Sequence, residues 1–198
     1  MEKPAENHYP IHDLIKRRWS PRSFADKPVA KETLQSLLEA ARWAASSFNE
    51  QPWRFILATK QDRVEYEKLF SIMVEGNQAW AKQAPVLMLT VAKLQFTLNQ
   101  KPNRHAFHDV GLAMSNLSLQ ATDMGLFVHQ MAGFSVEKAR ELYIIPSDAE
   151  PVAMVAIGYP GDTQTLPEKL RERELQPRER KPLKDLVYFG KWEKAWEK

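Results

Sequence analysis

The chain has 198 residues, of which 43% are hydrophobic and 27% charged, with a formal net charge of +3 and no cysteine. The small charge argues against a dedicated nucleic-acid binder. The lack of cysteine excludes disulfides, thiolate nucleophiles, iron–sulfur clusters and cysteine-based zinc sites. This length fits one domain over residues 1–198, with a core over about 14–165 and a C-terminal arm over about 166–198.

The N-terminus predicts no targeting segment. Residues 1–10 are polar and lack the apolar run of a signal peptide. The longest apolar stretches, residues 85–92 and 151–159, are far too short to span a bilayer. We therefore expect a cytoplasmic protein that partners neither a membrane nor a nucleic acid.

The first third of the chain predicts alternating helices and strands. Hydrophobic residues recur at helical spacing over residues 30–45, which indicates an amphipathic helix. Residues 54–59, rich in Phe, Ile and Leu, predict a short strand. Residues 62–75 predict a second helix, with Asp62 at its N-cap and Gly76 ending it.

The middle of the chain predicts a buried sheet. Residues 85–92 are almost continuously apolar, which is typical of a central strand covered by helices on both faces. A long helix is expected over residues 106–125, where small residues favour close packing in the centre or at a subunit contact. Residues 126–129 and 151–159 predict strands, with a short helix over 135–143 between them.

The arm contains many charges of both signs. Residues 166–184 are rich in Arg, Lys, Glu and Pro, which predicts an extended or partly helical segment with a solvated face. Arg178 and Arg180 stand two residues apart, so a contact with phosphate is an alternative interpretation. A contact with nucleic acid is a third, although the acidic residues argue against it.

Arg18, Ser20 and Arg22 alternate along the chain, so in an extended segment they project from one side. Arginine forms bidentate hydrogen bonds that suit a phosphate or an electron-rich ring edge. The alternative is a solvated basic turn after a short helix. Because the chain has neither the dinucleotide fingerprint nor the P-loop spacing, an anionic ligand would have to be held by side chains.

Four neutral polar residues, Ser46, Ser47, Asn49 and Gln51, lie between a predicted helix and strand. They either form ordinary caps and turns or read the edge of a flat heteroaromatic ring. Together with the cations, they suit a ligand with an anionic tail, a polyol middle and such a ring. Flavin mononucleotide (FMN) is a ligand of this kind.

Two further motifs have ambiguous roles. Gly133 permits the close approach of a flat ligand, but it also fits a loop-closing role. His105, His108 and Asp109 have a spacing that can place two imidazoles on one helix face, yet no further ligand set accompanies them, so we predict no metal site. No nucleophile elbow or Ser/His/Asp set is evident, which argues against hydrolysis.

Several motifs follow one another in order and together cover about residues 14–190. They are residues 18–22, 46–53, 77–85, 109–125, 132–134, 157–160 and 178–183. This ordered set resembles the FMN-dependent nitroreductase family. The resemblance implies an α+β three-layer sandwich, in which a central, mostly antiparallel sheet is flanked by helices. It also implies an intertwined homodimer that builds two shared FMN sites at its interface.

The resemblance assigns cofactor contacts residue by residue. The string around Arg22 would hold the phosphate, the ribityl chain and the N1/O2 side of one flavin, and the arm would return to the phosphate. The loop around Asn49 would reach that flavin from the other subunit, whereas Asn77 and Gly133 would contact its ring region. The full predicted set is Arg18, Trp19, Ser20, Arg22, Ser46, Ser47, Asn49, Gln51, Asn77, Met131, Ala132, Gly133, Arg178 and Arg180.

The implied activity is an FMN-dependent NAD(P)H oxidoreductase. NADH or NADPH would pass a hydride to flavin N5 and leave before a nitroaromatic, quinone or related small electrophilic acceptor enters the same space. Solvent can supply protons, so no dedicated catalytic side chain is predicted. The alternatives are a specialised flavin enzyme, for dehalogenation or flavin fragmentation, and an FMN-binding protein without turnover. The chain departs from the pattern of the resembled family at Trp80, because some members carry a cation at this position.

Overall fold

The computed structural model describes residues 2–196. Its α-helices are α1 (Asp13–Arg17), α2 (Lys31–Arg42), α3 (Arg63–Ser71), α4 (Glu75–Ala81), α5 (Ala106–Asp123), α6 (Val136–Tyr143) and α7 (Glu168–Leu175). Its strands are β1 (Trp53–Thr59), β2 (Val86–Lys93), β3 (Phe127–Met131) and β4 (Ala149–Gly158). Short 3₁₀ turns form η1 (Ser47–Asn49), η2 (Thr163–Thr165) and η3 (Leu183–Asp185).

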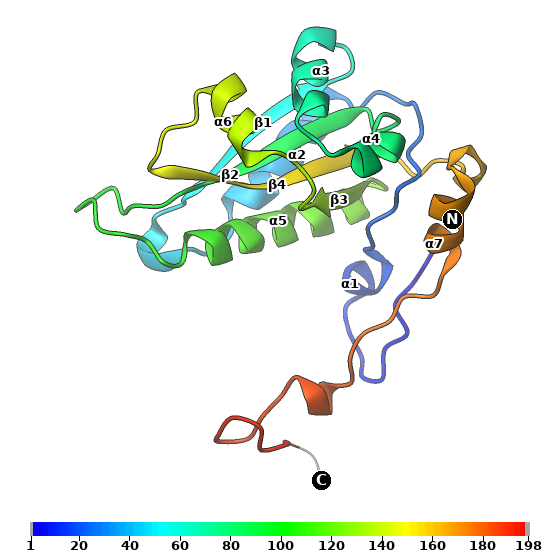
Figure 1. Cartoon of the computed structure of the whole chain (residues 1–198). Helices are drawn as coiled ribbons and strands as arrows, with labels where there is room; N and C mark the ends of the chain where they lie inside the picture. The colour runs from blue at the N-terminus through cyan, green and yellow to red at the C-terminus, as the bar shows by residue number, and fades with distance from the viewer. Residues whose placement is uncertain (1, 197–198) are drawn as a thin grey trace.

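The four strands form one antiparallel sheet in the order β1-β2-β4-β3. Helices α3, α4 and α6 lie on one face of this sheet, and α2 and α5 lie on the other (Figure 1). The predicted α+β fold with a central antiparallel sheet between helices is therefore confirmed. Among residues 2–196, none of the helices has the length and apolar character needed to cross a bilayer.

Strand β2 shows how the sequence produces these three layers. Its residues Leu87 and Leu89 belong to the hydrophobic cluster under α3, α4 and α6, whereas Val86 and Met88 belong to the cluster under α2 and α5. All four are fully buried. Alternate side chains of a strand point to opposite faces, so an almost unbroken apolar run is needed where both faces are covered.

The predicted helix over residues 62–75 is wrong at its C-terminal end. Helix α3 begins as expected, with Asp62 accepting a hydrogen bond from the backbone N–H of Glu65, but it ends at Ser71. Met73 then forms a bridge to Phe134. Gly76, expected to end the helix, lies in the first turn of α4. Apolar residues continued at helical spacing across the break, so periodicity alone did not reveal it.

The remaining elements differ from expectation mainly at their ends. Helix α2 stops at Arg42, three residues before the predicted end at Ala45, and α5 stops at Asp123. Strand β3 extends beyond His129 to Met131, and β4 already begins at Ala149. The partly helical arm is confirmed by α7.

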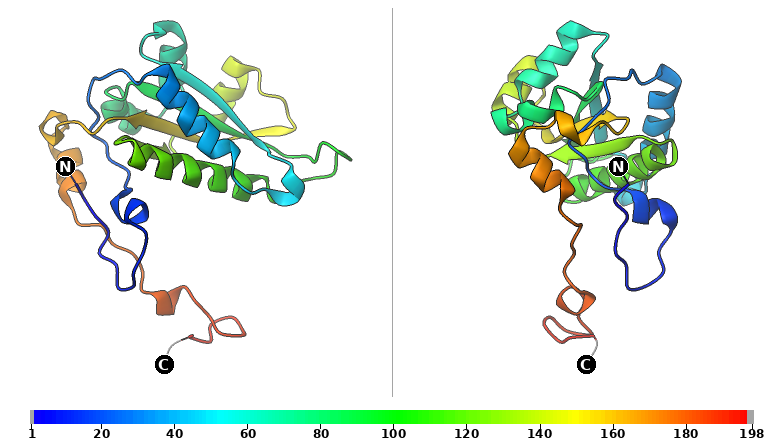
Figure 2. Two further views of the ribbon diagram at one scale, coloured as in Figure 1. Left: turned by 180° about the vertical axis from the view of Figure 1, so that it is seen from behind. Right: turned by 90° about the vertical axis from the view of Figure 1, so that its right-hand side faces the viewer.

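Both chain ends leave the body on the same side. The N-terminal segment and the arm run next to each other there, and the end of the arm projects away from the sheet (Figures 1 and 2).

The string of residues 18–22, which we call the N-terminal string, runs alongside the edge strand β3. Trp19 packs edge-on against Phe127, with ring centroids 6.0 Å apart, and a ring nitrogen of His129 lies 2.7 Å from the carbonyl oxygen of Pro21.

Candidate functional site

The two ends of the chain line one cavity of about 280 Å³. The N-terminal string contributes Arg18, Ser20 and Arg22, and the arm contributes Arg178 and Arg180. We call this cavity the arginine pocket. Trp19, from the same string, lines it too, so the structure brings together six predicted ligand-binding residues from the two ends of the sequence.

The arginine pocket concentrates positive charge. Burial lowers the pKa of the Arg18 guanidinium, and nearby Arg180 lowers it further. Burial likewise lowers the pKa of Arg178, with added repulsion from Arg18 and Arg180. Within residues 2–196, none of these three side chains forms an ion pair with a carboxylate. A bound anion would relieve their mutual repulsion, so this donor set suits a phosphate.

Trp19 also lines the arginine pocket and carries a buried donor without a partner within residues 2–196. Its side chain is only 7% exposed, and its indole Nε1–H has no hydrogen-bond partner among the described residues. A buried N–H without a partner costs about 1–3 kcal/mol, which an acceptor on a ligand would recover. The ammonium of Lys3, which also lines the pocket, lies 5.1 Å from the centre of the indole ring.

The sequence did not single out two residues that line the arginine pocket, Lys3 and Glu174. Glu174 is 1% exposed although it comes from a segment that reads as a solvated mixture of charges. Its only sequence signal is its position four residues before Arg178. One acidic residue among several in the arm gives no indication of burial.

A second group of predicted residues meets where β3 leads toward α6. The amide of Asn77 donates to the carbonyl of Gly133 over 2.9 Å, and the Val74 backbone N–H donates to the same oxygen over 3.1 Å. A Cβ on Gly133 would lie 2.7 Å from the Asn77 amide nitrogen. A larger residue would therefore displace the Asn77 side chain that closes this loop, which supports the loop-closing role. Met131 is buried in the core, whereas Ala132 is exposed.

The neutral polar residues form a tight turn around η1, which we call the amide loop (residues 46–51). Ser46 Oγ accepts from the backbone N–H of Gln51 over 3.0 Å, and the Gln51 amide donates to the carbonyl of Asn49. Buried Asp109 accepts from the backbone N–H of Ser47 over 3.0 Å. The sequence had marked Asp109 only as a conceivable metal ligand, but its carboxylate fixes this loop to the first turn of α5.

The amide loop carries backbone strain. Phe48, Asn49 and Gln51 all adopt the left-handed region, with φ values of 53°, 56° and 53°. Each such non-glycine residue costs on the order of 1 kcal/mol, and strain of this kind tends to gather at binding sites. Phe48 is also 93% exposed, so its ring is almost uncovered.

Helix α5 separates the two predicted parts of the site. The amide loop is tied to its first turn through Asp109, whereas the arginine pocket lies beyond its other end, where Trp19 packs on β3. Eighteen residues of α-helix span about 27 Å. Figure 1 shows the amide loop and the N-terminal string near opposite ends of α5.

Trp80 is a core residue. It is 2% exposed and lies between Phe24, with ring centroids 6.3 Å apart, and His129, with centroids 4.5 Å apart. The neighbouring Lys82 is exposed on the surface. A buried aromatic side chain of the core therefore occupies the position at which some members of the resembled family carry a cation.

His129 lies between this tryptophan and the N-terminal string. Burial lowers the pKa of its imidazole to about 4, with a further contribution from nearby Arg22. The ring is therefore neutral at pH 7, and its Nδ1–H donates to the Pro21 carbonyl. The folded state resists protonation of this ring, whereas the unfolded chain accepts a proton near pH 6.5.

Stability should consequently decline as the pH falls from about 6.5 to about 4, because the unfolded state then binds the additional proton. We expect His129 to contribute about 1–3 kcal/mol to this decline. His129→Asn keeps an N–H donor but does not titrate, so its urea-unfolding free energy should fall less steeply in this window. The control is His8→Asn at an exposed site, and equal slopes for His129→Asn and wild type would contradict the assignment.

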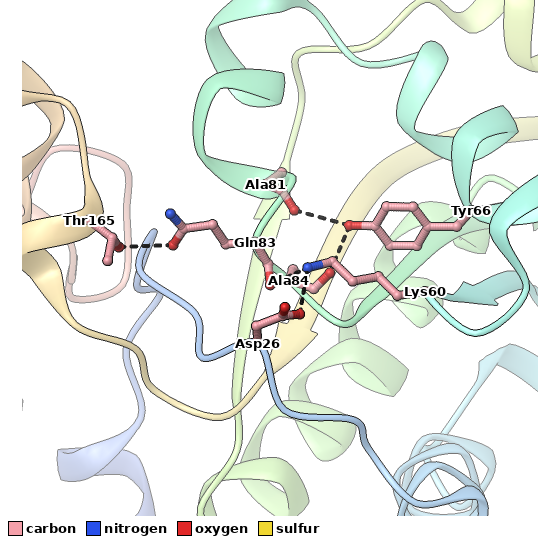
Figure 3. A network of polar contacts seen from close by, with 7 residues as sticks. All are labelled: Asp26, Lys60, Tyr66, Ala81, Gln83, Ala84 and Thr165. Atoms are coloured by element: carbon pink, nitrogen blue, oxygen red, sulfur yellow. Dashed lines mark hydrogen bonds and ion pairs between the residues drawn. The ribbon is translucent and has the colours of Figure 1, made fainter.

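A polar network joins the arm to the body near α4 (Figure 3). Lys60 Nζ donates to Asp26 over 2.9 Å and to the Gln83 carbonyl over 3.2 Å. Thr165 Oγ1 donates to the Gln83 side chain over 3.0 Å, and the buried Tyr66 hydroxyl donates to Ala84 over 2.7 Å. The Thr165–Gln83 bond ties the segment just before the arm to the body, whereas the other bonds lie within the body. No sequence pattern predicted these contacts.

Within the described part of the chain, no group of three or more His, Cys, Asp or Glu residues could hold a metal ion. In the predicted H-x-x-H-D motif, His108 Nδ1 lies 3.2 Å from Asp109 Oδ1, while the other carboxylate oxygen accepts from Ser47. His105 is instead the N-cap residue of α5, and its backbone N–H donates a hydrogen bond to the side-chain oxygen of Asn103.

Comparison with known proteins gives a consistent picture. The model of the nitroreductase family matches residues 15–159. A solved structure described as an oxidoreductase containing FMN is 37% identical, with a TM-score of 0.90 and 96% of each chain covered. A putative NADH dehydrogenase/NAD(P)H nitroreductase of Methanothermobacter thermautotrophicus is 29% identical over 77% of this chain and 78% of its own. An FMN reductase (NAD(P)H) of Bacillus subtilis is 27% identical over 80% of this chain and 69% of its own.

Proposed function

Because this chain belongs to the nitroreductase family, we propose that it is an FMN-dependent NAD(P)H oxidoreductase for nitroaromatic, quinone or related small electrophilic acceptors. The observation that carries the proposal is the arginine pocket. Arg18, Arg178 and Arg180 converge there without a carboxylate partner among residues 2–196, as an enclosed phosphate requires. The names of similar proteins, an oxidoreductase containing FMN and an FMN reductase, support the choice of cofactor.

In this proposal different residues bind different parts of FMN. Arg18, Arg178 and Arg180 hold the phosphate of FMN, and the free indole N–H of Trp19 donates to an oxygen of the same ligand. Arg22, which also lines the pocket, places positive charge beside the N1/O2 edge of the flavin. When bound, FMN supplies the hydride transfer between the nicotinamide and the acceptor. The protein contributes orientation and electrostatics, with no side chain assigned as general acid or base.

A second copy of the chain completes the site in this proposal. The exposed side of α5 presents Phe107 and Leu112, which are 49% and 37% exposed, around the small residues Gly111 and Ser115. Small side chains let two helices approach closely, and apolar area of this kind favours a subunit contact. A homodimer across this face would bring the amide loop of one protomer toward the arginine pocket of its partner. The strained, exposed Phe48 is then covered.

The test begins with protein reconstituted with FMN under anaerobic conditions. We expect NADH or NADPH to bleach the visible flavin absorbance, and a nitroaromatic or quinone to restore it with steady-state kinetics of the ping-pong type. Colour that persists with both nucleotides would contradict the oxidoreductase and favour an FMN-binding protein without turnover.

The same assay separates the specialised alternatives. Irreversible loss of the flavin spectrum would indicate flavin fragmentation, and halide release from a halogenated acceptor would indicate dehalogenation. Stopped-flow reduction rates with NADH and NADPH would establish the preferred donor. A cytoplasmic location and the absence of a nucleic-acid partner stay predictions.

A further inference from the structure

A buried carboxylate from the arm lies against the backbone of the N-terminal string. Glu174, on α7, is 1% exposed. Its Oε1 accepts hydrogen bonds from the backbone N–H groups of Arg22, over 2.7 Å, and Ser23, over 3.2 Å. Its Oε2 lies 3.6 Å from Arg22 Nη1. One carboxylate thus contacts both the backbone and the side chain of the same arginine.

The contact between Glu174 Oε2 and Arg22 Nη1 leaves the N–H groups of the guanidinium free to bind a ligand. A separation of 3.6 Å exceeds a hydrogen bond, so the carboxylate attracts the guanidinium without occupying its N–H groups. Glu174 Oε2 itself has no hydrogen-bond partner in the part of the chain that the structure describes. Since a buried charge is costly unless it is paired, the charge of Arg22 is what stabilises this oxygen.

The segment that carries Glu174 is held in place from the other end of the chain. Lys3 Nζ donates to the backbone carbonyl of Glu174, and Arg178 Nη1 donates to the carbonyl oxygens of Lys3 and Lys16 over 2.8 and 2.9 Å. These contacts fix the arm beside the N-terminal segment. The position of the carboxylate is therefore determined by several independent bonds.

We propose that Glu174 is a positioning residue for the flavin, which acts by holding Arg22 at the arginine pocket. This inference rests on the proposed function, because it assumes that Arg22 meets FMN. The direction in which FMN affinity changes when the Glu174 charge is removed distinguishes two roles of this residue. A carboxylate near an anion site repels the anion, so a purely electrostatic role would make binding tighter when the charge is removed. A positioning role makes binding weaker.

The test compares FMN affinity in Glu174→Gln and wild type by quenching of flavin fluorescence. We expect roughly tenfold weaker binding, because the glutamine amide places N–H donors toward Arg22 and displaces it. The midpoint potential of bound FMN should become more negative, since less positive charge stabilises the reduced flavin. Glu172→Gln, an exposed change of the same type on α7, should alter neither quantity.

A double-mutant cycle with Arg22→Ala identifies the route of the effect. If Glu174 acts through Arg22, Glu174→Gln should have little further effect once the arginine is absent. Unchanged or tighter binding in Glu174→Gln, or full additivity in the cycle, would overturn the inference. Should Glu174→Gln fail to fold, Glu174→Asp keeps the charge and should lose less affinity than Arg22→Ala. Wild-type protein that binds no FMN would instead overturn the proposed function.

Discussion

Replacing Arg18 and Arg178 together with alanine should weaken FMN binding by at least about a hundredfold at low salt, because each charge-assisted hydrogen bond to a phosphate contributes about 1.5–3 kcal/mol. The two side chains come from opposite ends of the chain and face one cavity. Neither has a carboxylate partner within residues 2–196, so neither substitution leaves a carboxylate unpaired. Arg178 also donates to the carbonyl oxygens of Lys3 and Lys16, so a ligand without phosphate is needed to separate a displaced arm from a lost phosphate contact. A titration followed by flavin fluorescence measures the loss.

Two controls separate the pocket from general effects of charge. Lys181→Ala with Lys184→Ala removes the same formal charge from exposed positions of the arm outside the arginine pocket and should change affinity little. Riboflavin, which lacks the phosphate, should bind the arginine variant and wild type with similar affinity. If riboflavin loses as much affinity as FMN, or if the lysine control loses a hundredfold, the arginines do not hold the phosphate.

Much of the fold follows from local pattern. The apolar run of β2 predicted burial on both faces because a strand can satisfy its backbone only within a sheet, and the sheet must then be covered. Asp62 was predicted as an N-cap, and its side chain accepts the expected backbone hydrogen bond. Periodicity failed between α3 and α4, where the chain leaves the helix to pair Met73 with Phe134. That partner is distant in sequence, so no local signal marks the break.

The candidate site shows the same division. Alternating arginines indicated an anion contact, and the structure brings these arginines to one pocket, while the anion contact itself stays a prediction. The roles of Asp109 and Glu174 were not predicted, because each role depends on the burial of a single carboxylate against a backbone N–H group that is distant in sequence. Burial of one charged residue is decided by tertiary packing, which hydrophobic periodicity does not record.

The proposal that two protomers share each site leads to a complementation result. A pocket variant, Arg18→Ala with Arg178→Ala, and a loop variant, Ser46→Ala with Asn49→Ala, should each bind little FMN alone. When equal amounts are unfolded and refolded together, half of the dimers should contain one of each. Each mixed dimer combines an intact pocket with an intact loop at one of its two sites, so about a quarter of all sites should recover wild-type affinity.

This result depends on where the two halves lie in one chain. The amide loop is fixed to the start of α5 by Asp109, and the arginine pocket lies past its end, so a rigid helix of about 27 Å keeps them apart within a protomer. Recovery on mixing therefore requires that the loop and the pocket come from different copies. Refolding each variant separately before mixing supplies the control, because dimers that have not exchanged subunits should recover no sites. If co-refolding also fails to restore binding while wild type refolds normally, the loop and the pocket do not serve the same flavin.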